Sequence, residues 1–279
     1  MCIPDSQGSL ASSPGALKRS RTRIFILSLL SLGTMINYLD RTILGIVAPK
    51  LTTEIHIDPA MMGIVFSAFA WTYALAQIPG GMFLDRFGNK LTYALSIFFW
   101  SLFTLLQSFS LGLKSLLLLR LGLGVSEAPC FPANSRIVSK WFPQHERARA
   151  TATYTVGEYI GLAAFSPLLF LILEHHGWRT LFFLTGGLGI LFTFVWWRFY
   201  HEPHESKTAN KAELDYIGAD QVANKSENIP FNWRDARRLL CCRQIIGASL
   251  GQFAGNTTLV FFLTWFPTYL ANERHLPWL

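Results

Sequence analysis

Seven long apolar stretches dominate the sequence, separated by shorter polar or basic connections. They cover residues 24–49, 59–84, 91–113, 115–137, 150–173, 180–197 and 244–272. A helix of about 20 apolar residues crosses the hydrocarbon core of a bilayer, so each stretch is long enough to span it. Because backbone groups in lipid need internal hydrogen bonds, helices are the expected form. The pattern therefore predicts an all-α integral membrane protein with seven spans.

The basic residues indicate how these spans are oriented. Lys and Arg are concentrated before the first stretch and in every second connection, whereas the alternate connections carry few. Cytoplasmic loops are enriched in Lys and Arg, so the N-terminus is expected to be cytoplasmic and Leu279 to lie on the far side. The first stretch is longer than the apolar region of a cleaved signal peptide and is expected to be retained.

Polarity also divides the chain into segments. Residues 1–23 are polar and basic, residues 24–200 hold six spans, residues 201–242 form a long polar loop, and residues 243–279 contain the seventh span. Inside the loop, residues 212–216 are expected to form a short helix. Residues 233–240 carry three arginines and are expected to form an amphipathic helix at the membrane surface.

Composition excludes several classes of function. Hydrophobic residues make up 51% of the chain and charged residues 15%, against roughly a quarter charged in soluble domains. The net charge of +7 is spread between apolar stretches, which does not favour nucleic-acid binding. The cysteines and histidines lack metal-ligand spacing, and no nucleophile lies at catalytic spacing from a base. We expect neither an enzyme nor a bound metal or cofactor.

Adjacent charges in the first stretch are the most informative feature. Asp40 and Arg41 share a helix face with Asn37, and Tyr38 flanks this face. Charged side chains at membrane depth usually face a bundle interior or a water-filled cavity. The alternative is a self-neutralising structural pair, but neighbouring residues on a helix point in different directions. A polar cavity is therefore the preferred interpretation.

Other polar residues fall within the apolar stretches. Tyr73 and Gln77 lie one helical turn apart, and they suit either hydrogen bonding to a hydroxylated ligand or contact between helices. Arg120 and Glu127 lie on one stripe of the fourth stretch. Glu158 is the lone acid of the fifth stretch, and we expect it to line the cavity.

A loop motif follows the second stretch. Residues 81–90 read G-x-x-x-D-R-x-G-x-K, in which Gly81 and Gly88 permit close helix approach and a tight turn. Asp85 and Arg86 are suited to pairing with a helix end, and Lys90 closes the motif. This segment resembles the loop motif of the major facilitator superfamily of secondary transporters. Arg120 and Gly124 resemble the second motif of that superfamily, R-x-x-x-G.

Three further segments narrow the resemblance. N-Y-L-D-R in the first stretch, S-E-A-P-C-F-P in the fourth and T-W-F-P-T-Y-L in the seventh are similar to the anion:cation symporter family, and within it to bacterial sugar-acid transporters of the D-galactonate, glucarate and hexuronate type. The resemblance implies a multi-pass protein of the bacterial inner membrane, surrounded by lipid, that takes up a small organic anion with protons or sodium. That family has twelve spans in two halves. The chain is thus expected to hold the N-terminal six-helix half and the seventh helix, and not to transport alone.

The resemblance and the charges together assign roles within the site. The acids of the matching segments, Asp40 and Glu127, are expected to bind the coupling proton, with Arg120 controlling Glu127 and Glu158 as the next candidate. Arg41 is expected to anchor a carboxylate, because the guanidinium fork suits bidentate recognition. Its neighbours Tyr38, Tyr73 and Gln77 are the candidates for binding hydroxyls.

Two other functions fit parts of the pattern. A seven-helix receptor has the same span number, but such proteins usually have an outside N-terminus, and retinal types need a lysine in the seventh span. A drug/proton antiporter of the same superfamily is the stronger alternative. Arg41 favours an anionic over a cationic substrate.

Overall fold

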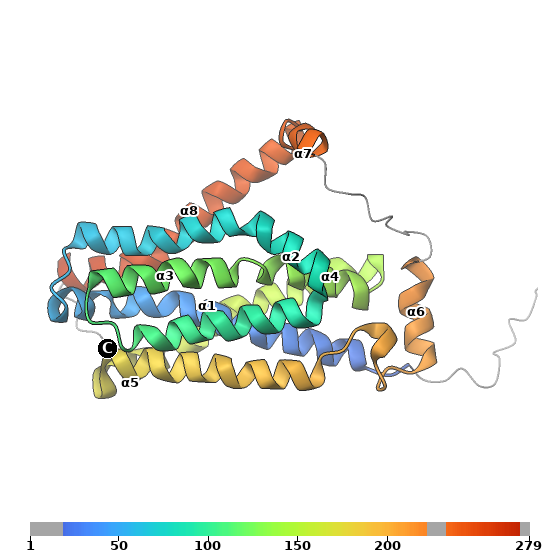
Figure 1. The fold of residues 1–279 in the computed structure, drawn as a ribbon, viewed down its shortest axis with the longest axis horizontal. Helices are drawn as coiled ribbons and strands as arrows, with labels where there is room; N and C mark the ends of the chain where they lie inside the picture. Colours follow the sequence, from blue (N-terminus) through green and yellow to red (C-terminus); the bar gives the residue numbers. More distant parts are fainter. Residues whose placement is uncertain (1–18, 222–232, 274–279) are drawn as a thin grey trace, which may run out of the picture.

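A computed structural model describes residues 19–221 and 233–273 and contains no strand within them (Figure 1). The elements are α1 (Thr22–Glu54), α2 (Pro59–Gln107), α3 (Leu113–Glu127), α4 (Cys130–Trp141), α5 (Gln144–Phe199), the 3-10 helix η1 (Pro203–Glu205), α6 (Lys211–Gln221), α7 (Trp233–Leu240) and α8 (Arg243–Glu273). Most of the polar N-terminal segment, part of the long loop and the end that includes Leu279 lie outside the described residues.

The seven expected spans are present as helical segments. Five helical stretches of the described chain are long and apolar enough to cross a membrane, and two of them, α2 and α5, each reverse direction in the middle. The reversals lie at Gly88, with φ of 78°, and Gly177, with φ of 77°. Positive φ is accessible to glycine at little cost because it has no Cβ. The all-α fold predicted from the sequence is confirmed.

One expected boundary was wrong, and one expected span is interrupted. The third span ends at Gln107 instead of continuing to Leu113, because Ser108 and Ser110 form a turn in which their hydroxyls donate to the carbonyls of Leu105 and Gln107, at 2.7 and 2.8 Å. The fourth span is divided between α3 and α4 rather than continuous. Pro129 precedes α4 and lacks the N–H that would continue the helical hydrogen bonds.

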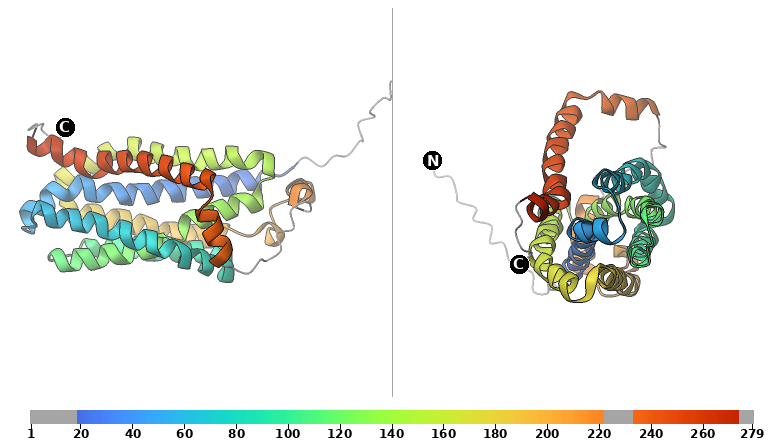
Figure 2. Two further views of the ribbon diagram at one scale, coloured as in Figure 1. Left: turned by 90° about the horizontal axis from the view of Figure 1, so that it is seen from above. Right: turned by 90° about the vertical axis from the view of Figure 1, so that its left-hand side faces the viewer.

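The spanning segments form a bundle with α8 along one side and α7 outside it (Figure 2). At one end of the bundle, where α1 begins and α5 ends, α6 lies across the helix ends (Figure 1). The apolar core is divided into two clusters. Along α1, Ile26 to Ile36 belong to the first and Leu39 to Leu51 to the second. The polar residues Asn37, Asp40 and Arg41 therefore lie near the junction of the two clusters.

Candidate functional site

A cavity of about 600 Å³ lies between α8 and the bundle. Its walls include Tyr38, Arg41, Phe66, Ser67, Phe69, Tyr73, Arg120, Phe131, Gln252, Asn256 and Trp265. Four of the residues singled out in the sequence thus meet in one cavity, namely Tyr38, Arg41, Tyr73 and Arg120. Gln77 is only partly buried and is not among the lining residues.

Arg41 pairs with Glu127 across the bundle. The Nε of Arg41 donates to Oε1 of Glu127 at 2.6 Å, and Nη2 contacts the same oxygen. The Glu127 side chain is almost completely buried, whereas 21% of the Arg41 side chain remains exposed. Asp40 instead accepts a hydrogen bond from Thr104 at 3.4 Å. The two adjacent charges therefore have different partners, and Arg41 presents its charge at the cavity wall.

Aromatic rings surround the Arg41 guanidinium. Its central carbon lies 4.9 Å from the ring centre of Tyr73, 5.0 Å from Tyr38, 5.4 Å from Phe69 and 5.8 Å from Phe131. Cations within about 6 Å of a ring centre are attracted by the ring quadrupole. The rings restrict the orientation of the guanidinium, so an anion entering the cavity meets a preoriented donor.

Arg120 lies close to both buried acids without a direct ion pair. It is 3% exposed and interacts electrostatically with Glu127 and Asp40. Within the described residues, its Nε and Nη2 have no hydrogen-bond partner and no acid lies within ion-pair distance. The stripe shared by Arg120 and Glu127 on the fourth span therefore does not produce a bridge between them, and Glu127 reaches α1 instead. The buried residues Asp40, Arg120 and Glu127 therefore lie together with the partly buried Arg41.

Glu158 reaches the site through Tyr38. It is buried on α5, and the Tyr38 hydroxyl is its hydrogen-bond partner. The close approach of α5 to α1 depends on Gly161, where an added Cβ would lie 2.7 Å from Cγ of Met35. Glu158 is not itself among the residues that line the cavity.

The position of Tyr73 and Phe69 depends on a close contact between α2 and α3. A Cβ added at Gly124 would lie 2.1 Å from Oγ1 of Thr72 and 2.6 Å from the carbonyl oxygen of Phe69. Real Cβ atoms do not approach backbone oxygens this closely, so any larger residue would separate the helices. Gly124 therefore brings the aromatic wall against Arg41.

The loop motif has distinct partners for its members. Asp85 accepts a hydrogen bond from Arg136 at 2.8 Å, and the same nitrogen donates to the Leu84 carbonyl at 3.1 Å. Gly88 makes the reversal between the two halves of α2. Arg86 lies over the Phe87 ring, at 5.6 Å. Lys90 lies 5.4 Å from the ring centre of Trp197.

Gly81 has open space around it. No atom lies within 4 Å of a Cβ built there, whereas a Cβ at Gly80 would lie 2.9 Å from Cγ of Pro129. In the described part of the chain, close helix approach therefore falls to Gly80 rather than to Gly81.

Sequence reasoning missed the contribution of α8 to the cavity. Gln252 and Asn256 lie one helical turn apart, and the Gln252 amide donates to the Asn256 side-chain oxygen at 3.4 Å. Trp265 packs on Phe66 with 5.7 Å between the ring centres. The sequence did contain a signal for this wall of the cavity, because two amide side chains at i and i+4 interrupt an uncharged span. Among the described residues, no group of three His, Cys, Asp or Glu could hold a metal ion.

Comparison with known proteins identifies relatives over most of the chain. A D-galactonate transporter of Escherichia coli is 46% identical over 266 residues, covering 93% of this chain and 62% of the relative. The Bacillus subtilis protein named probable galactarate/D-glucarate transporter GudP is 42% identical over 277 residues, covering 95% of this chain and 61% of the relative. The chain thus spans about three fifths of the length of these curated relatives.

Solved structures share the fold. A bacterial homologue of the human lysosomal transporter Spinster, in an inward-facing and unoccupied conformation, superposes with a TM-score of 0.58 at 28% identity. The match covers 65% of this chain and 44% of that protein. The xylose transporter XylE of Escherichia coli superposes with a TM-score of 0.57 at 13% identity, over 73% of this chain and 53% of XylE.

The sequence model of the Major Facilitator Superfamily matches residues 30–279 of this chain. This range includes the charged centre at Arg41 and Glu127, the glycine reversal at Gly88 and the α8 wall of the cavity. Sequence family and fold agree, and the chain belongs to the Major Facilitator Superfamily.

Proposed function

We propose that this chain forms part of a secondary transporter that takes up a sugar-acid anion of the D-galactonate or glucarate type across the bacterial inner membrane. The observation that carries the proposal is Arg41, a partly buried cation presented at the wall of a cavity of about 600 Å³. The names of the relatives, a D-galactonate transporter and a galactarate/D-glucarate transporter, support the same class of substrate.

The cavity offers complementary groups for both ends of such a molecule. The substrate carboxylate binds the Arg41 guanidinium through charge-assisted hydrogen bonds. Its hydroxyls hydrogen bond to Tyr38 and Tyr73 on the bundle and to Gln252 and Asn256 on α8, all of which line the cavity. Gln77 lies outside this set.

The Arg41–Glu127 pair provides a route to proton coupling. The substrate carboxylate and the Glu127 carboxylate require the same guanidinium donors. Protonation of Glu127 removes its charge and releases Arg41 to the substrate, so proton and anion bind together. Asp40 is the second proton site, and Arg120, which interacts with both acids, stabilises whichever of them is charged.

The complete cycle requires two halves. In this fold, alternating access is a rocking of one repeat against the other around a site at mid-membrane. Residues 24–200 supply one six-helix half and α8 the seventh helix, and the polar segment 201–242 connects them. Residues 1–23 and this loop lie on the cytoplasmic side, as the Lys and Arg bias predicts.

A chimera tests the proposal. This chain replaces the matching part of the Escherichia coli D-galactonate transporter, and the product is reconstituted in liposomes. Uptake of labelled D-galactonate driven by an imposed proton gradient, and abolished by a protonophore, is the expected result. If a folded, monodisperse chimera carries no sugar acid, the proposed substrate is wrong. If uptake responds only to a sodium gradient, the proposed coupling ion is wrong. The 279-residue chain alone is expected to show no uptake.

A further inference from the structure

A second cavity lies at the end of the bundle where α1 begins and α5 ends, away from Arg41. It has a volume of about 740 Å³, an apolar floor that includes Ile26 and Trp141, and a rim that includes Arg21, Arg198 and Lys207. We propose that this cavity binds the headgroup of an anionic phospholipid in the leaflet on the α6 side of the membrane. The proposal depends on the chain being embedded in a membrane and not on what it transports.

The rim carries an excess of positive charge. Arg21, Arg198 and Lys207 come from three separate segments, and no acid of the described chain lies within ion-pair distance of them. Glu205 also lies on the rim, but its side chain is 56% exposed and its carboxylate lies 3.8 Å from Nε2 of His204. Three cations that line one cavity, none of them in an ion pair with an acid of the described residues, form a site for an external anion.

The membrane-facing side of the cavity is aromatic. Phe25 and Phe199 line the cavity, pack edge to face with 5.9 Å between ring centres, and are both about half exposed. The exposed Trp197 lies two residues before Phe199. Exposed Trp residues at helix ends are typical of the membrane–water interface, and Phe25 and Phe199 add exposed apolar surface beside Trp197. A phosphate at the rim therefore has an apolar surface beside it for acyl chains, which a small inorganic anion would not use.

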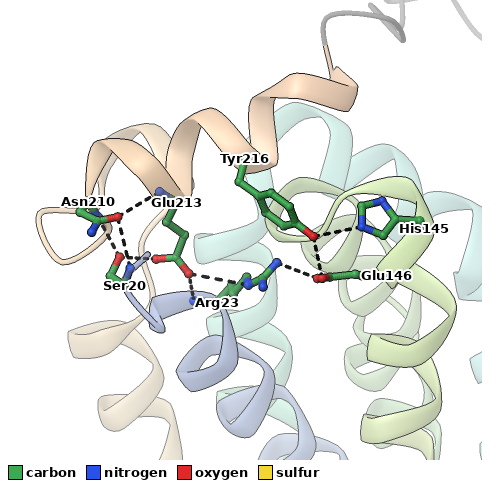
Figure 3. Close-up of polar contacts among 7 residues, drawn as sticks. All are labelled: Ser20, Arg23, His145, Glu146, Asn210, Glu213 and Tyr216. Carbon is green, nitrogen blue, oxygen red and sulfur yellow. Dashed lines mark hydrogen bonds and ion pairs between the residues drawn. The ribbon is translucent and has the colours of Figure 1, made fainter. Parts of the chain in front are cut away.

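Hydrogen bonds between distant segments keep the rim together. The Ser20 N–H donates to Oδ1 of Asn210 at 3.2 Å, and the Asn210 N–H donates to the Ser20 hydroxyl oxygen at 2.9 Å (Figure 3). The same hydroxyl donates to the fully buried Glu213 at 2.5 Å. These bonds join the residue before Arg21 to the segment that follows Lys207, so two of the three cations are held at one site.

The beginning of α5 completes this support. Arg23 donates to Glu146 at 2.6 Å, and the Tyr216 hydroxyl donates to the other oxygen of Glu146 at 2.8 Å (Figure 3). The Arg23 guanidinium also lies 4.8 Å from the ring centre of Tyr216. Helix α6 is thereby fixed to both α1 and α5. The rim is a preformed site rather than a group of independent surface charges.

The chemistry of the rim matches a lipid phosphate. Basic pockets between spanning helices near the membrane surface bind anionic headgroups, and each Lys or Arg close to the surface contributes about fivefold to the affinity. Arginine binds phosphate oxygens in a bidentate manner, whereas lysine acts as a point charge. Neutralising all three cations is therefore expected to weaken binding by about a hundredfold.

Lipid titration followed by native mass spectrometry tests the site. The 279-residue chain in neutral detergent is titrated with dioctanoyl phosphatidylglycerol and, separately, with dioctanoyl phosphatidylcholine. Preferential phosphatidylglycerol adducts are expected. Arg21→Gln, Arg198→Gln and Lys207→Gln should each weaken them about fivefold. Lys211→Gln is the matched control, because it removes the same charge from an exposed position on α6 outside the cavity.

Three results overturn the proposal. The first is equal binding of phosphatidylglycerol and phosphatidylcholine, and the second is an equal effect of Lys211→Gln and Lys207→Gln. The third is full displacement of phosphatidylglycerol by excess inorganic phosphate, which identifies a small-anion site instead. Circular dichroism of each variant verifies folding. Lys207 lies in an exposed connection, so Lys207→Gln is expected to fold normally. This variant still tests the site if an arginine variant is unstable.

Discussion

The Glu127 carboxylate on α3 accepts a 2.6 Å hydrogen bond from Arg41 on α1, which lies 86 positions earlier in the chain. Arg41 thus has a buried intramolecular anion as its partner, and its remaining exposed surface faces the cavity. An anion that binds Arg41 therefore competes with the Glu127 carboxylate for the same guanidinium donors. The next two predictions follow from this competition.

Replacing Arg41 with lysine is expected to weaken sugar-acid binding in the chimera about tenfold or more, because lysine cannot reproduce a bidentate contact or four ring contacts. Binding of the neutral galactitol should change far less. Titration of substrate protection against thermal unfolding measures both. Arg179→Lys is the control, since Arg179 donates to the Ser108 carbonyl in a turn outside the cavity. Equal weakening of both ligands would make Arg41 a structural residue.

Replacing Glu127 with glutamine is expected to abolish proton-driven accumulation in the chimera and to preserve exchange of labelled for unlabelled substrate. Glutamine keeps the shape of the side chain but cannot be protonated or hold a charge against Arg41. Glu158→Gln is the matched variant, because Glu158 is also a buried acid but contacts the site only through Tyr38. If the Glu127→Gln variant still accumulates substrate and the Glu158→Gln variant does not, the proton-binding residue is Glu158 and not Glu127.

The sequence predicted the span pattern and the charged centre because both depend on local chemistry. A run of apolar residues is expensive to expose to water, and a charge inside such a run needs a partner, so Asp40, Arg41 and Glu127 could be found without coordinates. Which acid pairs with Arg41 depends on how α1 and α3 cross. Spacing on one helix placed Arg120 and Glu127 on one stripe, but only packing decides that Glu127 reaches across to Arg41.

The fold around α6 was the least predictable part. The sequence indicated a short polar helix near residues 212–216, and its actual extent is Lys211–Gln221. Its docking depends on Glu213, which is fully buried although it lies in a polar loop. An acid in such a loop normally faces water, and its partner Ser20 lies 193 positions away. No local sequence pattern indicates that Glu213 is buried against Ser20.

Gly88→Ala is expected to destabilise the chain by about 1–3 kcal/mol, because φ of 78° with ψ of 173° is a region that only glycine adopts readily. Gly81→Ala, in the same motif, should leave stability unchanged or raise it slightly, since no atom lies within 4 Å of the added Cβ. The midpoints of thermal unfolding in detergent compare the two variants. An equal loss in both would mean that the motif is sensitive to bulk rather than to backbone conformation.

Two acids near the reversal at Gly88 are expected to have different roles. Glu202 is expected to stabilise the fold, whereas Asp85 is expected to affect the movement of the half-bundle. Glu202 is buried and accepts hydrogen bonds from Asn89 at 3.0 Å and Lys140 at 3.1 Å, so Glu202→Gln is expected to cost about 1–3 kcal/mol of stability. The Asp85 side chain is 78% exposed, and exposed ion pairs such as its contact with Arg136 contribute little to stability. Asp85→Asn should therefore leave the thermal midpoint almost unchanged and lower the uptake rate of the chimera. If it lowers the midpoint as much as Glu202→Gln, the Asp85–Arg136 pair stabilises the half-bundle and does not control its movement.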